Sequence, residues 1–120
     1  MTGNSGPYLQ YAHARIRSIF DRTPDRPGPV TLTHPAERAL ALELLAFEPT
    51  IEHVAGTLEF HRLTTHLYAV ASAFSAFYER CPVRKSETPI RRSRLALCER
   101  TARTLREGLG LLGISAPDRL

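Results

Sequence analysis

Apolar residues recur every three or four positions along most of the chain, which is the spacing of one buried face of an α-helix. This pattern predicts five helices, at about residues 5–22, 33–47, 50–58, 60–81 and 89–112. Pro7 and Pro35 suit the first turn of a helix, whereas Pro49 and Pro82 are expected to end one. No stretch alternates between apolar and polar residues for long enough to predict a strand. We therefore expect an all-α fold, an antiparallel bundle of about five helices in a single domain over residues 1–120.

Composition agrees with one ordinary globular domain, since 42% of the 120 residues are hydrophobic and 23% are charged. No apolar run reaches the length of a membrane span, and the first residues lack the pattern of a secretory signal. The two cysteines, Cys81 and Cys98, lie far apart with no CxxC spacing. Buried free thiols in a reducing cytoplasm fit this usage, so we expect a cytoplasmic protein with no membrane partner.

Charge is unevenly distributed along the chain. The formal net charge is +4, and Arg outnumbers Lys fifteen to one. Residues 34–59 carry five Glu against one Arg, whereas residues 84–120 carry eight Arg and one Lys against four acidic residues. Basic ends favour a polyanionic partner such as nucleic acid, and guanidinium groups suit phosphate contacts.

The first predicted helix carries a second stripe beside its apolar one. Tyr8, Tyr11, Arg15, Ser18 and Arg22 recur at steps of three and four, so they share one helical face. Two aromatic rings followed by guanidinium groups can stack on unpaired bases and hold phosphates. The alternative is that the tyrosines cover the edge of the core and the arginines are merely solvated.

A second basic cluster, Arg91, Arg92 and Arg94, begins the last predicted helix. A helix N-terminus favours anions, so this cluster is a candidate phosphate site. The alternative is a solvated polar face, which is at least as good an interpretation for the arginines further along this helix.

The histidines do not form a catalytic or metal-binding pattern. His13 lies on the apolar side of the first helix and is expected to be a buried residue that hydrogen-bonds to backbone. His61 and His66 are five residues apart, which is the wrong interval for a shared metal ion on one helix. We find no nucleophile motif and no glycine-rich phosphate loop, so we expect no catalytic residues, no cofactor and no metal.

Four blocks of sequence resemble one family in their order and spacing. They are GPYLQYAHARI at 6–16, AxAFxxFYxxCPV at 71–83, RLALC at 94–98 and LLGIxAP at 111–117. Together they resemble the C-terminal anticodon-binding (DALR) domain of arginyl-tRNA synthetases, and they span nearly the whole chain. The resemblance implies a helical bundle of the type found in class I synthetases, which binds the anticodon stem-loop of arginine tRNA isoacceptors.

Residue by residue, the resemblance points to Tyr8, Tyr11, Tyr78 and the terminal Leu120 as neighbours of the anticodon bases. One departure is the ending Arg119-Leu120, where the family commonly ends in Arg-Met. The HIGH and KMSK signatures of the adenylate-forming domain do not occur, so no aminoacylation activity is expected from this chain by itself. It is expected to be either an excised domain or a freestanding paralogue.

A rival function is a protein–protein module that docks on a synthetase or another enzyme. Leu42, Leu45 and Ile51 lie outside the main apolar stripes, with Val30 and Leu32 nearby in sequence. An exposed apolar patch favours association, so we expect a homodimer or a partner protein through residues 30–55. The acidic residues Glu37, Glu43, Glu48 and Glu52 belong to the same segment and are either part of this surface or a solvated face.

Overall fold

The computed structural model of the protein describes residues 5–119. These residues form five helices and no strand. The helices are α1 (Ser5–Asp21), α2 (Pro35–Leu45), α3 (Phe47–Thr57), α4 (Phe60–Arg80) and α5 (Thr88–Leu111). The all-α class predicted from the apolar spacing is therefore confirmed.

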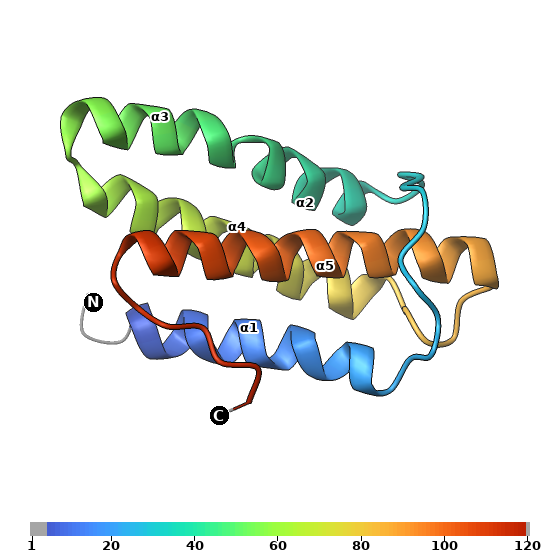
Figure 1. Cartoon of the computed structure of the whole chain (residues 1–120). Coiled ribbons are helices and arrows are strands. Elements are labelled where there is room, and N and C mark those ends of the chain that lie inside the picture. The colour runs from blue at the N-terminus through green and yellow to red at the C-terminus, as the bar shows by residue number, and fades with distance from the viewer. Residues whose placement is uncertain (1–4, 120) are drawn as a thin grey trace.

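The helices form a bundle in which successive limbs along the chain run in alternating directions (Figure 1). α2 and α3 follow each other almost end to end and together make one limb, with α4 running back beneath them (Figure 1). α5 lies between this limb and α1, and it packs against α1, α2 and α4. α1 also contacts α4, so a seam between α1 and α4 runs along the bundle.

The break between α2 and α3 lies at Ala46, earlier than the sequence predicts. Pro49 does not end a helix as expected, because it lies within the first turn of α3. The first turn has no intrahelical acceptors for its N–H groups, so the missing N–H of proline costs nothing there.

Two helix ends follow the chemistry that the sequence indicates. His34 is the N-cap of α2, and its Nδ1 accepts a hydrogen bond of 3.0 Å from the Ala36 N–H. Gly113 follows α5 with a φ of +78°, and the Ile114 N–H donates to the Leu109 carbonyl over 2.8 Å. This is the Schellman arrangement that a glycine beyond a helix end favours.

The core lies where the long helices face each other. Leu9, Leu40, Leu67, Phe77 and Leu105 are each fully buried. Both thiols are also buried and free, as predicted, and burial raises the pKa of Cys98 to about 12.

α4 and α5 approach each other closely at Gly108. A Cβ at this position would lie 2.5 Å from Cδ2 of Leu67. Only a residue without a side chain allows this packing of the two helices.

The segment after α5 returns across α1 (Figure 1). We call residues 112–119 the C-terminal tail. Gln10 donates through Nε2 to the Ser115 carbonyl over 2.8 Å, and His13 Nδ1 lies 3.2 Å from the Pro117 carbonyl. His13 is buried, which confirms the prediction of a core histidine bonded to backbone. Because a carbonyl only accepts, the neutral imidazole carries its proton on Nδ1.

None of the helices within residues 5–119 is both long and apolar enough to span a membrane.

Candidate nucleic-acid interface

The tyrosines predicted to stack on bases lie along the seam between α1 and α4. Tyr8 stacks on Tyr68 of α4, with ring centroids 5.1 Å apart and planes inclined by 15°. Tyr8 keeps 44% of its surface exposed, so its ring supports a stack and is still open to solvent. A ring that covers the edge of the core has a similar exposure, so the stacking role of Tyr8 stays a prediction.

Tyr11 lies one turn further along α1 and is 67% exposed. Among the described residues its ring makes no aromatic contact, so the ring is open to a ligand on this face. Stacking on a base contributes about 1–3 kcal/mol per base and needs such an open ring.

A second aromatic contact closes the other end of the seam. The guanidinium carbon of Arg15 lies 5.5 Å from the ring centroid of Tyr78, a cation–π geometry. Tyr78 in turn stacks against the buried Phe74, with centroids 5.8 Å apart and planes inclined by 15°. The structure thus brings together four of the residues predicted to bind RNA, namely Tyr8, Tyr11, Arg15 and Tyr78. We call these four residues with Tyr68 the aromatic seam.

Sequence reasoning did not single out Tyr68. It lies on the long α4, where a tyrosine at helical spacing is more often part of the core, and no stripe distinguishes it. The sequence held no signal for it, because a spacing of ten residues leaves Tyr68 and Tyr78 about 80° apart around the helix axis.

The arginines at the start of α5 are placed differently from the expectation. Arg91 forms an ion pair through Nε with Asp25 of the proline-rich loop, and also donates to the Ser86 carbonyl over 2.6 Å. Arg92 is exposed, and its Nε donates to the Arg26 carbonyl over 3.0 Å. The proline-rich loop is residues 23–29, and these contacts tie it to the start of α5.

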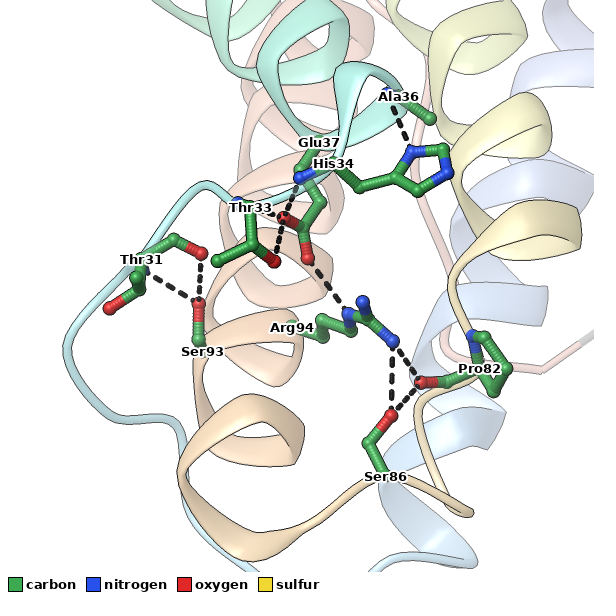
Figure 2. Close-up of polar contacts among 9 residues, drawn as sticks. All are labelled: Thr31, Thr33, His34, Ala36, Glu37, Pro82, Ser86, Ser93 and Arg94. Carbon is green, nitrogen blue, oxygen red and sulfur yellow. Dashed lines mark hydrogen bonds and ion pairs between the residues drawn. The ribbon is translucent and has the colours of Figure 1, made fainter.

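Arg94 lies inside a polar network between α2 and α5, as Figure 2 shows. Its Nε donates to Glu37 Oε2 over 2.8 Å, and the two side chains are only 11% and 1% exposed. A second guanidinium nitrogen donates to the Pro82 carbonyl over 2.7 Å and to Ser86 Oγ over 3.0 Å. These contacts use Nε and one terminal nitrogen of the guanidinium, and we therefore no longer propose that Arg94 binds phosphate.

Glu37 is correspondingly not part of a solvated acidic face. Its Oε1 accepts hydrogen bonds from the backbone N–H groups of Thr33 and His34, at 2.6 and 2.9 Å (Figure 2). Burial by itself would raise the pKa of Glu37, but the hydrogen bonds from Arg94, Thr33 and His34 outweigh burial and lower this pKa. The carboxylate is therefore held ionised, and it joins the N-terminus of α2 to α5.

The last predicted contact, Leu120, lies outside the described residues. Within residues 5–119, no group of three or more His, Cys, Asp or Glu side chains could hold a metal ion.

Comparison with known proteins places this arrangement in a family. The family model described as "DALR anticodon binding domain" matches residues 9–120. The arginine–tRNA ligase of Frankia casuarinae is 54% identical over 98% of this chain, and that of Thermobifida fusca is 54% identical over 100%. The matches cover 21% and 22% of those relatives, so the chain spans about one fifth of their length.

Solved structures agree with the sequence relatives. The arginyl-tRNA synthetase of Thermus thermophilus superposes with a TM-score of 0.88 at 38% identity, over 96% of this chain and 21% of that protein. The arginyl-tRNA synthetase of Plasmodium falciparum gives a TM-score of 0.81 at 29% identity, over 94% of this chain and 21% of that protein. With its family match, its relatives and its bundle in agreement, the chain belongs to the DALR anticodon binding domain family.

Proposed function

We propose that this chain binds tRNA through the anticodon stem-loop, with a preference for arginine isoacceptors. The observation that carries the proposal is the aromatic seam, which exposes rings and a guanidinium on one face of a domain from an anticodon-binding family. The preference for arginine tRNA is supported by the names of the relatives and of the two solved synthetases.

The length of the seam suits a few nucleotides. Tyr8 and Arg15 are seven residues apart on α1, which separates them by about 10 Å along the helix axis. Nucleotides of one strand rise by about 3.4 Å each when stacked, so the seam matches about three unpaired bases. Tyr8, Tyr11 and the Arg15–Tyr78 pair supply one contact surface each along this length.

The proposal is tested with the anticodon stem-loop of arginine tRNA, measured by fluorescence anisotropy. Tyr11→Ala should weaken binding by about 1–3 kcal/mol while leaving helix content unchanged, because its ring is exposed and its loss opens no cavity. Phe60→Ala is the matched control, since Phe60 is a similarly exposed aromatic at the far start of α4. Equal effects of the two substitutions would refute the stacking role of Tyr11.

Specificity and salt dependence are measured in the same assay. Affinity should fall with added salt, because bound arginines release counterions from the RNA. An unrelated tRNA stem-loop should bind more weakly, and equal affinity for both would refute the preference for arginine tRNA. No binding at low salt would refute the proposal as a whole. We assign no aminoacylation activity to this chain by itself, and an aminoacylation assay with arginine, ATP and tRNA tests that part.

A second candidate function is protein association through residues 30–55. Leu42 and Leu45 are 68% and 74% exposed, and Val30 is 50% exposed, so this face exposes apolar side chains to solvent. A groove of about 600 Å³ lies beside them, with Leu44, Leu45 and Leu97 in its lining. Ile51, which was expected on this surface, instead packs against the core.

Light scattering over a concentration series tests this association as a homodimer, and a synthetase added to the sample tests it as a complex. Leu45→Glu should abolish either complex, whereas Ile90→Glu, at the start of α5, should not. A monomer under both conditions would refute this second function without affecting the first.

A further inference from the structure

α1, α5 and the C-terminal tail enclose a cavity on the flank of α1 that faces away from α4. Its volume is about 220 Å³, well above the roughly 10–15 Å³ that one water molecule needs. Its charged and titratable lining residues are His13, Arg17, Glu99, Arg103, Arg106 and Asp118. Ala102 completes the lining, so the cavity is mainly polar.

Three arginines line this cavity from two helices. Arg17 comes from α1, where its guanidinium carbon also lies 4.9 Å from the ring centroid of Phe20. Arg106 and Arg103 come from adjacent turns of α5, and Arg103 also lines the groove beside α2. The two carboxylates of the lining, Glu99 and Asp118, do not form an ion pair with any of the three among the residues that the structure describes. The lining therefore has one formal positive charge in excess, and within residues 5–119 its guanidinium groups have no carboxylate partner.

The buried His13 adds no charge to the cavity. Burial is the main reason that the pKa of His13 is lowered; the Pro117 carbonyl and the charge of Asp118 raise this pKa, and Arg106 and Arg17 lower it. The imidazole is thus neutral, and the positive charges of the lining are those of the arginines. They are separate from the cluster at the start of α5, where Arg91 and Arg94 are paired with carboxylates.

We infer that this cavity binds one phosphodiester group of the RNA backbone. A phosphodiester carries one negative charge, which matches the excess charge of the lining. Guanidinium groups donate two parallel hydrogen bonds to phosphate oxygens, which favours this ligand over a spherical anion. The inference rests on the proposed function, because the strand is held in reach by the aromatic seam on the other side of the same helix.

The test compares two arginines of α5 that differ only in where they lie. Arg106→Gln removes a charge from the cavity, whereas Arg100→Gln removes the same charge from the groove on the other side of α5. Both side chains are exposed, so neither substitution is expected to unfold the helix, and circular dichroism verifies this. Binding of the arginine tRNA anticodon stem-loop is measured by anisotropy over a salt series.

Arg106→Gln should weaken binding about three- to tenfold and reduce the slope of log affinity against log salt by about 0.7–0.9, the contribution of one phosphate. Arg100→Gln should change the affinity less than twofold. Arg103 lines both the cavity and the groove, so the effect of Arg103→Gln should lie between those of the other two variants. An unchanged affinity in Arg106→Gln would overturn the inference. Equal effects of Arg106→Gln and Arg100→Gln would also overturn it, because the arginines would then act only through net charge.

Two further outcomes separate this inference from the proposed function. If the wild type binds RNA and Tyr11→Ala weakens binding while Arg106→Gln matches Arg100→Gln, only the phosphate site is wrong. If the wild type does not bind RNA, both fail. In the last experiment, inorganic phosphate alone is titrated into the protein, and NMR signals of the arginine side chains are monitored. Signals of Arg106 that move with phosphate but not with RNA would identify a free-anion site and overturn the assignment to RNA.

Discussion

Replacing Glu37 by Gln removes one oxygen acceptor and one negative charge from a place where four donors converge. Oε1 accepts from the Thr33 N–H, the Thr33 hydroxyl and the His34 N–H, and Oε2 accepts from Arg94. Gln offers one oxygen and one NH₂ group. Whichever way the amide turns, its NH₂ group faces a donor, so either the α2 cap or Arg94 loses its acceptor.

The expected loss of stability is about 3–5 kcal/mol, the cost of breaking a buried ion pair by removing one partner. The Glu37 side chain is 1% exposed and that of Arg94 is 11% exposed, so water cannot replace the missing acceptor. Because small domains are stable by only about 5–15 kcal/mol, the variant should unfold at a clearly lower urea concentration.

The pH dependence gives the substitution an independent signature. The pKa of Glu37 is lowered from 4.5 in the folded protein, so the unfolded chain takes up a proton before the folded one does. The stabilisation is therefore complete above pH 4.5 and is lost as the pH falls below it. Gln does not titrate, so the stability gap between wild type and variant should narrow below pH 4.5.

Urea unfolding followed by circular dichroism at several pH values measures both effects. Glu59→Gln is the control, since its ion pair with Arg62 is exposed and should contribute little. A Glu37→Gln variant within about 1 kcal/mol of wild type at neutral pH, or a gap that does not change with pH, would refute the reasoning. A separate variant, Arg94→Gln, tests the role of Arg94. It should destabilise the fold and leave the RNA affinity per folded molecule unchanged. A stable variant with weaker RNA binding would show that Arg94 binds RNA.

Three further predictions concern the packing and the tail. Leu105→Ala should cost about 2–5 kcal/mol in urea unfolding, because Leu105 is fully buried. Gly108→Ala should destabilise by about 1–3 kcal/mol because its Cβ would overlap Leu67, whereas Gly110→Ala, with no atom within 4 Å of the new Cβ, should stabilise by up to about 1 kcal/mol. The pKa of His13 is lowered from 6.5, so unfolding should become easier as the pH falls below 6.5, and a His13→Gln variant should lack this part of the pH dependence.

The helices could be predicted from the sequence because their signals are local. Apolar spacing predicted the extent of α1, α4 and α5, and Pro35 marked the start of α2 correctly. The prediction that Pro49 ends a helix was wrong. Proline breaks a helix in its interior but fits its first turn, and the sequence alone does not show where the preceding helix stops.

The site could be predicted only in part because its contacts join distant segments. The stripe on α1 is local, so Tyr8, Tyr11 and Arg15 were found, but their partners on α4 are set by how the two helices pack. The same limit explains Arg94, whose partner Glu37 is 57 residues away. A cluster of arginines in the sequence does not reveal which of them form ion pairs with carboxylates in the folded protein.

That division of the arginines bears directly on how RNA would lie on this domain. At the start of α5, Arg91 pairs with Asp25 and Arg94 pairs with Glu37. These ion pairs hold the proline-rich loop and α2 in place. In the second half of α5, Arg106 lines the cavity beside the C-terminal tail and has no carboxylate partner among the described residues. The unpaired positive charge therefore lies next to α1, whose other side presents the exposed tyrosines. If bases occupy the seam with α4, the backbone of the strand faces α5 and the tail, and the salt dependence of binding should come from the second half of α5 and not from its first turn.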